Sequence, residues 1–312
     1  MFVSEAYDRL SYQKMLSILT IIFTLLFTLS CTRRAPQQSS ATSVSSSTNT
    51  PPVPFIAIEG DPLTIYVAED ASYQVIYRNP DGSQAGQVYS PFAENADAGL
   101  FARYNNFVIG PNFDADYRIT VANIYDPWIP ISQTMVTGSG LDSDPWVVDT
   151  EVSHSSSITM TSQTSYVNGD NFFNITWEIC LPNPGNISTF LAADFSLVGE
   201  NNWSGSYESS TGSVGAINIP QNWSESFTPI HPATHFTAAY YKTVWDAIGS
   251  QSVPGTGFND IIATLENAIG AGLQWDLMIS GCATIQANWC VGPSTTCPPQ
   301  TGERTFLPLI HK

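Results

Sequence analysis

Basic residues are scarce in this sequence. Its 312 residues include 10 Lys and Arg against 27 Asp and Glu, which gives a net charge of −17. The charges of residues 1–31 cancel, so the acidic excess lies in the rest of the chain. Six basic residues follow Phe55: Arg78, Arg103, Arg118, Lys242, Arg304 and Lys312. No basic face can form from so few cations, which excludes nucleic acid as a partner.

Motifs of known catalytic and metal sites are also missing. No CxxC or Cys/His spacing typical of zinc sites occurs, and no G-x-S-x-G elbow accompanies His154 and its neighbouring serines. His231 and His235 have the four-residue spacing of a metalloprotease helix, but Pro232 follows the first and no Glu lies between them. The sequence therefore predicts no catalytic residue and leaves enzymatic activity open.

A long apolar run occurs once, near the N-terminus. Leu16–Leu29 carries no charge and contains only Ser and Thr as polar residues, and Ser30 and Cys31 follow it. An apolar run, a small residue and then Cys resemble a bacterial lipoprotein signal. The match is imperfect, because Thr28 and Leu29 stand in the reverse of the usual order.

The resemblance implies that the Cys31 thiol receives a diacylglyceryl group and becomes the mature N-terminus, so that acyl chains hold the protein to a membrane. Two alternatives remain: ordinary cleavage that releases a free protein, or a retained segment, which is short against the roughly 20 apolar residues of a normal span. We expect 1–31 to form a signal or lipid-anchor helix and 32–54, rich in Ser, Thr and Pro, to be a disordered stalk. The body is then predicted to be extracytoplasmic and anchored to the cell membrane or surface.

From Phe55 onward the sequence alternates between apolar and polar residues in short runs. Leu63–Val67 and Tyr73–Tyr77 are examples, rich in β-branched and aromatic residues. The clearest hairpin joins 158–167 to 172–181 through Asn168 and Gly169. These patterns predict an all-β, mainly antiparallel, sandwich-like body.

Two short helices are expected within this β body. The first follows Thr234, carries apolar residues at every fourth position and ends at Gly249; the second runs from Asp260 to Ile269. We divide the body into an N-terminal β unit, 55–137, and a main domain, 138–291. The tail, 292–312, either docks as an edge strand, since Pro308 excludes a central one, or serves as a recognition tag.

The body resembles uncharacterised secreted bacterial β proteins. The residues that carry the resemblance are VTGSG at 136–140, DPWVV at 144–148, YVNGD at 166–170, NFF at 171–173, TVWDAIG at 243–249 and GAGLQW at 270–275. The resemblance implies a secreted β fold and no known activity.

The cysteines that remain if Cys31 is lipidated are even in number. Cys180, Cys282, Cys290 and Cys297 predict two disulfides in an exported chain, with three connectivities. Cys180 and Cys282 each lie opposite the apolar face of their run, so these two thiols can meet across a strand pair. Cys290 and Cys297 can close the short loop between them.

Two weak ligand sites are suggested by residue type. Asp142, Asp144 and Asp149 offer hard oxygen ligands beside Gly138 and Gly140, which suits calcium, although solvated turn carboxylates are the simpler interpretation. No other cofactor is predicted.

Several tryptophans lie near predicted loops, where an exposed indole can stack on a sugar ring or, alternatively, complete the core. These candidates are Trp128, Trp146, Trp203 and Trp223.

The sequence thus predicts an exported, membrane-tethered surface protein with a non-catalytic binding or structural role, whose partner is a carbohydrate or another surface protein. The alternative is a carbohydrate-active enzyme or a sugar-binding module acting outside the cytoplasm.

Overall fold

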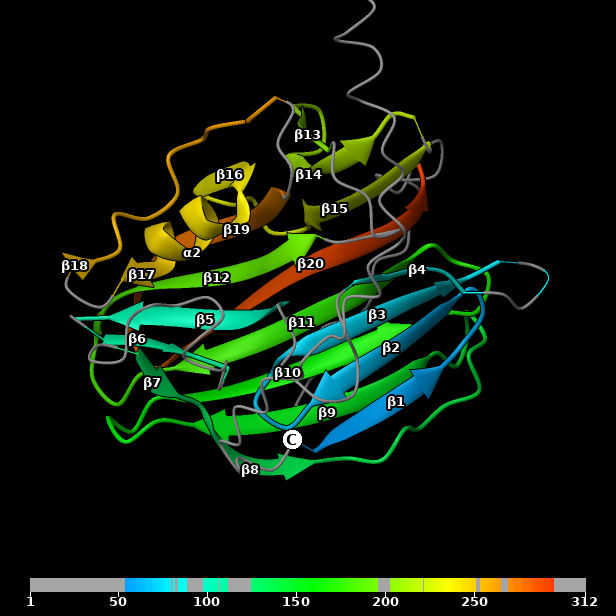
Figure 1. The fold of residues 1–312 in the computed structure, drawn as a ribbon. Helices are drawn as coiled ribbons and strands as arrows, with labels where there is room; N and C mark the ends of the chain where they lie inside the picture. The colour runs from blue at the N-terminus through cyan, green and yellow to red at the C-terminus, as the bar shows by residue number, and fades with distance from the viewer. Residues whose placement is uncertain are drawn as a thin grey trace, which may run out of the picture. The chain divides into compact units, whose positions relative to one another are not determined.

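The computed structural model describes residues 54–79, 81, 84–88, 98–105, 107–111, 125–195, 203–220, 222–250, 253–264 and 269–294 (Figure 1). The predicted leader with Cys31, nearly all of the stalk and most of the C-terminal tail lie outside these residues. Within them the fold is mainly antiparallel β with a single short helix, which confirms the predicted all-β class. No helix in the described ranges has the length and apolar character needed to span a membrane.

The largest sheet has eight strands, and all neighbours in it are antiparallel. In spatial order they are β13 (Ser204–Glu208), β14 (Ser213–Asn218), β15 (Trp223–Pro229), β20 (Cys282–Pro293), β11 (Phe172–Cys180), β10 (Thr159–Tyr166), β9 (Trp146–Ser153) and β8 (Ile129–Gln133).

Two smaller sheets accompany it. The four-stranded sheet runs β1 (Phe55–Glu59), β2 (Leu63–Ala68), β3 (Tyr73–Arg78) and β4 (Gln84–Val88). The six-stranded sheet runs β16 (His235–Tyr240), β19 (Ile269–Ile279), β12 (Gly185–Phe195), β5 (Ala98–Tyr104), β6 (Phe107–Gly110) and β7 (Tyr125–Pro127), with only β6 and β7 parallel. The helix α2 (Tyr241–Ile248) follows β16 directly, and the short strands β17 (Gly249–Ser250) and β18 (Val253–Pro254) come next.

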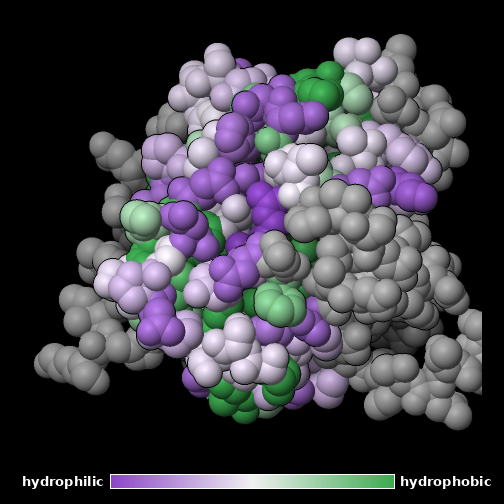
Figure 2. Space-filling view, turned by 90° about the vertical axis from the view of Figure 1, so that its left-hand side faces the viewer, coloured by the Kyte–Doolittle hydropathy of each residue, from purple (hydrophilic) through white to green (hydrophobic). Residues whose placement is uncertain are grey.

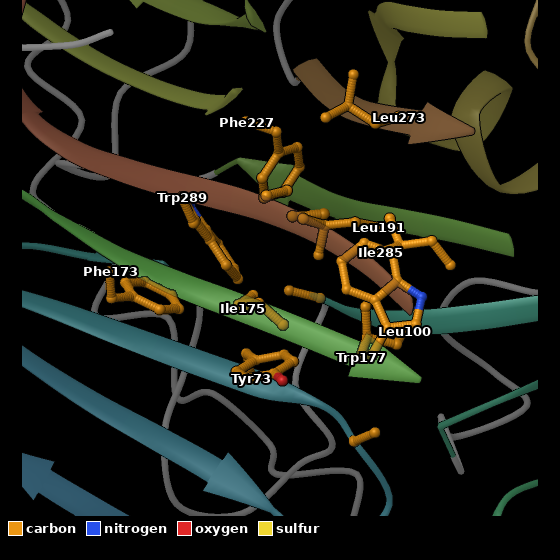
Figure 3. Packing of buried hydrophobic residues seen from close by; sticks show 14 of the residues in the cluster. Tyr73, Leu100, Phe173, Ile175, Trp177, Leu191, Phe227, Leu273, Ile285 and Trp289 are labelled. Atoms are coloured by element: carbon orange, nitrogen blue, oxygen red, sulfur yellow. The ribbon is translucent and has the colours of Figure 1, made fainter. Parts of the chain in front are cut away.

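Both smaller sheets pack on one face of the eight-stranded sheet. From the four-stranded sheet, Tyr73 contacts the rings of Phe173 and Trp289. From the six-stranded sheet, Trp275 meets Trp177 edge to face with ring centroids 5.1 Å apart. Figure 3 shows Tyr73, Phe173, Trp177 and Trp289 among the side chains that lie between the sheets. Each large apolar side chain buried here contributes roughly 1.5–3 kcal/mol, so this shared aromatic layer is the main source of stability.

The predicted boundary at 137/138 lies between segments that share sheets and core. β5, from the first segment, pairs with β12 of the second, and β8 pairs with β9. Buried apolar residues from both segments belong to one contiguous cluster. Along the described chain, strands from either side of this boundary therefore depend on the same packing.

The predicted hairpin and one predicted disulfide are confirmed. β10 and β11 pair antiparallel around a turn in which Gly169 has φ +93°, the left-handed conformation that favours glycine. Cys180 and Cys282 face each other across β11 and β20 and form a disulfide. Cys290 is also disulfide-bonded, and its predicted partner, Cys297, lies outside the described residues.

The helix predictions need correction. The first predicted helix is strand β16 over its first half and helix α2 over its second. The strand forms because His235–Tyr240 finds a complete hydrogen-bonding partner in β19, which outweighs the local four-residue periodicity. In the second predicted helix, 261–263 is not helical and runs beside β16, with bonds from Ala238 N–H to Ile261 O and from Ala263 N–H to Ala238 O. Ile269 already begins β19, and 265–268 lie outside the described residues.

Candidate functional site

The site lies on the face of the six-stranded sheet that points away from the core. Side chains alternate between the two faces of a strand, so residues paired across strands share a face. Arg103 of β5 pairs with Ser188 of β12, which pairs with Asp276 of β19. Three polar side chains therefore form a row across three adjacent strands, on the opposite face from Trp275.

Asp276 is the most firmly held member of this row. Ser188 donates its hydroxyl to Oδ1 of Asp276 at 2.6 Å. Gln274 donates Nε2–H to both carboxylate oxygens, at 2.8 and 2.9 Å. The Asp276 N–H bonds Thr234 Oγ1 at 3.0 Å. The side chain of Asp276 is nevertheless 41% exposed, so a carboxylate fixed in orientation remains available to a ligand.

Gln274 owes its orientation to a backbone contact. Its buried Oε1 accepts the N–H of Phe258 at 2.7 Å, which obliges the amide nitrogen to face Asp276. The loop that carries Phe258 is thereby attached to the carboxylate of Asp276. Gly257 in this loop has φ +83°, and a Cβ there would approach Gln274 Oε1 to 2.8 Å. Glycine at 257 permits this close approach.

Arg103 is half-buried and occupied mainly by the protein. It donates to the carbonyl of Gly255 and, at 3.4 Å, to Ser188 Oγ, while its guanidinium lies 5.5 Å from the ring centroid of Phe190. Burial lowers the pKa of Arg103, and the nearby Asp276 carboxylate opposes that shift to a smaller degree. The guanidinium stays charged because an arginine is not deprotonated in proteins.

A second polar group adjoins the row. His235 of β16 pairs with Gln274, and its Nδ1 lies 3.2 Å from Asp260 Oδ2. Its Nε2 lies 3.9 Å from Asp276 Oδ2. Asp260 is held in turn by the N–H of Phe236, which Oδ1 accepts at 3.0 Å. One imidazole therefore stands between two half-exposed carboxylates.

A pocket of about 680 Å³ opens over the Arg103–Ser188–Asp276 row. This volume is in the range of small-molecule sites, roughly 300–1,000 Å³. The other lining residues lie on the same strands or just beside them. They are the polar residues Tyr104, Asn105 and Asn186, together with Pro184, Gly185, Ile187, Leu277 and Met278. Figure 2, which views the molecule from the left-hand side of Figure 1, shows hydrophilic residues across the middle of that side and hydrophobic ones in separate patches.

The rest of the same sheet face is covered. Val244, Trp245 and Ile248 of α2 pack with Phe190, Ala192 and Phe258 in a second apolar cluster. Gly272 makes this possible, because a Cβ at that position would come within 2.6 Å of the Phe258 ring. The helix and the Phe258 loop thus close one half of the face and leave the polar half open.

The three aspartates proposed for calcium do not converge. Among the described residues, Asp142, Asp144 and Asp149 form no group with ligand atoms close enough for one ion. Asp149 lies on β9, and its Oδ1 accepts Gln163 Nε2–H at 2.9 Å. Asp144 bonds through its backbone to Leu141 and Ser139. The calcium role of these three aspartates gains no support from this arrangement and stays a prediction.

The tryptophans proposed as ligand platforms divide into two kinds. Trp128 and Trp203 are 2% and 1% exposed and belong to the core rather than to the surface. Trp146 is half-buried and donates to Asn168 Oδ1, and Trp223, also half-buried, packs on Tyr77. None of these four lines the pocket. A ligand role for Trp146 and Trp223 stays a prediction.

His154, which carries no catalytic motif in the sequence, lies beside Ser156 and Asp126. Its Nδ1 lies 2.7 Å from Ser156 Oγ and accepts the Ser156 N–H, while Nε2 lies 3.4 Å from Asp126 Oδ2. Because Ser156 is only two residues away and its N–H is bound to the imidazole, this arrangement is a local turn that ties Asp126 to the β9–β10 connection.

The pocket residues were not among those predicted from the sequence. Gln274 and Asp276 alternate with Leu273, Trp275 and Leu277, so the sequence does carry the signal that both point away from the core. What it lacks is the pairing of β12 with β5 on one side and β19 on the other, which joins Arg103, Ser188 and Asp276 across 173 residues of chain, from position 103 to position 276.

Comparisons with known proteins give distant matches in solved structures only. No protein-family model matches the chain, and no curated protein matches its sequence. A bacterial glucoamylase complexed with acarbose is similar over 75% of this chain and 31% of its own, at 12% identity and TM-score 0.46. A putative aldose 1-epimerase from Escherichia coli K12 is similar over 77% and 99%, at 7% identity and TM-score 0.41.

A heparan sulfate lyase, HepC, from Pedobacter heparinus is similar over 77% of this chain and 36% of its own, at 9% identity and TM-score 0.39. The chain thus spans about a third of the glucoamylase and of the lyase. Similarities this distant carry no argument about the ligand or the reaction, and the case for function rests on the pocket.

Proposed function

We propose that this protein binds carbohydrate, without chemically changing it, in the pocket over Arg103, Ser188 and Asp276. The observation that carries the proposal is the row itself: a guanidinium, a hydroxyl and an orientated carboxylate on neighbouring strands. Neighbouring sugar hydroxyls each donate and accept a hydrogen bond, so they match a surface that offers both kinds of partner side by side. Asn105 and Asn186 at the pocket wall extend the same chemistry.

The size and polar lining of the pocket support a sugar over an apolar ligand. Its lining contains Arg103, Asp276, two Asn and one Ser, and half-buried Tyr104 supplies one aromatic face beside them. An apolar ligand would leave these groups desolvated and unpaired, at a cost of roughly 1–3 kcal/mol each. A hydroxyl-rich ligand replaces the water that they bind.

A glycan array with the labelled full-length protein tests this proposal. We expect retention of a defined set of glycans, and loss of that signal in Asp276→Ala and Ser188→Ala, which remove the acceptor and the central hydroxyl. Asp144→Asn removes a charge from an exposed turn of the eight-stranded sheet and should bind as the unchanged protein does. Absence of any retained glycan, or retention that ignores both pocket substitutions, contradicts the proposal.

One observation favours the alternative of a carbohydrate-active enzyme. His235, between Asp260 and Asp276, has the geometry of a proton-transfer group. Asp260 can fix the imidazole tautomer through Nδ1, so that Nε2 faces Asp276. Proton NMR of a retained glycan during prolonged incubation distinguishes the two functions. Unchanged sugar signals support binding alone, whereas a chemical change that disappears in His235→Ala supports the enzyme.

We also propose that the body is exported and tethered through Cys31. The leader pattern supports this, and so does the disulfide between Cys180 and Cys282, because disulfides persist mainly in oxidising compartments. Mass spectrometry of the mature N-terminus, compared between the unchanged protein and Cys31→Ala, tests the tether. A diacylated Cys31 is expected; an intact leader or cleavage at another residue would contradict it.

A further inference from the structure

The charges around the pocket are not balanced. Among the described residues that line it, Arg103 is the sole cation and Asp276 the sole anion. Asp260 adds a second carboxylate just beyond His235. The fixed cations elsewhere in the described chain are Arg78 and Lys242, against a net charge of −17 for the whole protein. Both the local groups and the overall field therefore disfavour an anionic ligand.

The one cation at the pocket is poorly placed to receive an anion. Arg103 already donates to Gly255 O and Ser188 Oγ and packs over Phe190. Its guanidinium is half-buried, and Asp276, one strand beyond Ser188 in the row, is near enough to raise the pKa of Arg103. An incoming carboxylate or sulfate would have to displace these contacts and would also approach Asp276, so the favourable and unfavourable contributions offset each other.

The carboxylate of Asp276 is in the opposite situation. The hydrogen-bond partners that orient it, Ser188 and Gln274, are neutral, and the nearby Arg103 donates to Gly255 O and Ser188 Oγ instead, so Asp276 keeps part of its negative charge on the pocket side. A ligand ammonium placed there would gain charge-assisted hydrogen bonds, which are roughly twice as strong as neutral ones. Asp260, 45% exposed, strengthens the attraction from the far side of His235.

We infer that the pocket selects sugars that carry a free, protonated amine over uncharged sugars, and that it rejects sugars that carry a carboxylate or sulfate. The inference rests on the proposed function, since it names the class of carbohydrate for the same pocket. Asp276 is the residue that would decide the selection, with Gln274 as the residue that positions it.

Three trimers of equal length test the inference by isothermal titration calorimetry on the full-length protein: a glucosamine trimer, a glucose trimer and a galacturonic acid trimer. The first two differ in having an ammonium or a hydroxyl at one position of each ring. At slightly acidic pH and low salt, we expect the glucosamine trimer to bind about tenfold more tightly than the glucose trimer. Binding of the galacturonic acid trimer should be undetectable.

The variant Asp276→Asn keeps the side-chain shape and removes the charge. It should bring the glucosamine and glucose trimers to within about twofold of each other, because the charge-assisted bonds are lost. Added salt should weaken glucosamine binding to the unchanged protein and should not weaken glucose binding. Asp144→Asn makes the same change of charge on the other sheet and should keep the preference for glucosamine.

The outcomes separate the two proposals. Equal binding of the two trimers, or preferred binding of galacturonic acid, overturns the inference and leaves carbohydrate binding intact. The same holds if none of the trimers binds while the array finds another glycan whose retention depends on Asp276. If no glycan binds in either experiment, both proposals fail.

Discussion

The outer face of the six-stranded sheet has two halves that are built from the same strands and differ completely in character. At one end, Phe190 and Ala192 of β12 lie under α2 and Phe258 in a dry apolar cluster. At the other end, Ser188 of the same strand lies at the floor of an open polar pocket. Along β12, Ser188 in the open half and Phe190 in the covered half are only two positions apart. A short helix and one loop thus decide where the sheet can bind a ligand.

Gln274 marks the border between the halves. Its Oε1 holds the Phe258 loop over the covered half, and its Nε2 holds Asp276 in the open half. The comparison predicts that substitutions in the covered half reduce stability, whereas those in the open half reduce binding. Four measurements test this difference between enclosed and open groups.

Trp245→Ala should have the largest effect. Trp245 is fully buried and its ring centroid lies 5.5 Å from that of Phe101. Removing a buried indole leaves a cavity and should lower the free energy of unfolding by about 3–5 kcal/mol. Urea denaturation gives the value. Met278→Ala, at an 82% exposed position of the open half, is the control and should change it by less than about 0.5 kcal/mol. Similar losses in both variants would erase the distinction.

Removal of the disulfide between Cys180 and Cys282 should cause the second-largest loss of stability. Cys180 and Cys282 join positions 102 residues apart in sequence, at the ends of β11 and β20 where Leu181 N–H bonds Gly281 O. The double variant Cys180→Ala, Cys282→Ala releases a long loop in the unfolded chain and should cost about 2–5 kcal/mol. Thermal unfolding with and without a reducing agent measures it. The reducing agent should lower the melting temperature of the unchanged protein by more than it lowers that of the double variant.

Glu225 contrasts with Asp276 as a carboxyl group enclosed by protein. Burial holds the pKa of Glu225 well above its usual value; the Trp289 N–H, which Oε1 accepts at 2.9 Å, lowers that pKa by less, and nearby Asp194 raises it further. The folded state therefore keeps a proton that the unfolded chain loses above a pH of about 4.5. Through this group, the stability of the protein falls as pH rises from that value toward the folded-state pKa.

Glu225→Gln removes this titration while keeping an acceptor for Trp289. The variant should gain stability relative to the unchanged protein as the pH is raised from about 5 to 8. Glu225→Leu, which leaves the buried indole N–H without its acceptor, should lose about 1–3 kcal/mol relative to the Gln variant. Melting temperatures across that pH range provide the test, and parallel curves for the Gln variant and the unchanged protein would contradict it.

Asp276→Asn should have the smallest effect on folding. The carboxylate is 41% exposed, Ser188 and Gln274 can still donate to the oxygen of the Asn side chain, and surface electrostatic contributions are about 0–1 kcal/mol. We expect its free energy of unfolding in urea to lie within about 1 kcal/mol of the unchanged protein. A loss as large as that of Trp245→Ala would mean that the open half is structural.

The strands that could be predicted are those whose pattern is local. Alternation in 63–67 and 73–77 and the Asn168-Gly169 turn were sufficient for β2, β3 and the β10–β11 hairpin. The alternation of side chains between the two faces of a strand was also sufficient to pair Cys180 with Cys282. This alternation is informative because the face to which a side chain points is fixed by its position in the strand, whatever the strand packs against.

The incorrect predictions share a different cause, which is a contact with a segment distant in sequence. His235–Tyr240 has apolar spacing that suits a helix, yet it becomes an edge strand because β19 offers it a row of backbone partners. Trp128 seemed suited to a surface platform, yet it is buried and its indole N–H donates to Leu100 O. In both cases the outcome depended on a neighbour distant in sequence, which no local pattern specifies.

Composition and periodicity are enough to specify a β-sheet protein poor in cations, in which Gln274 and Asp276 point away from the core. The long-range packing of the fold places β5, β12 and β19 side by side, covers one half of their outer face with α2, and brings Arg103, Ser188 and Asp276 together in the other half. The physical reason is that the direction of a side chain is a property of its own strand, whereas the partners of a strand are chosen by packing across the whole fold.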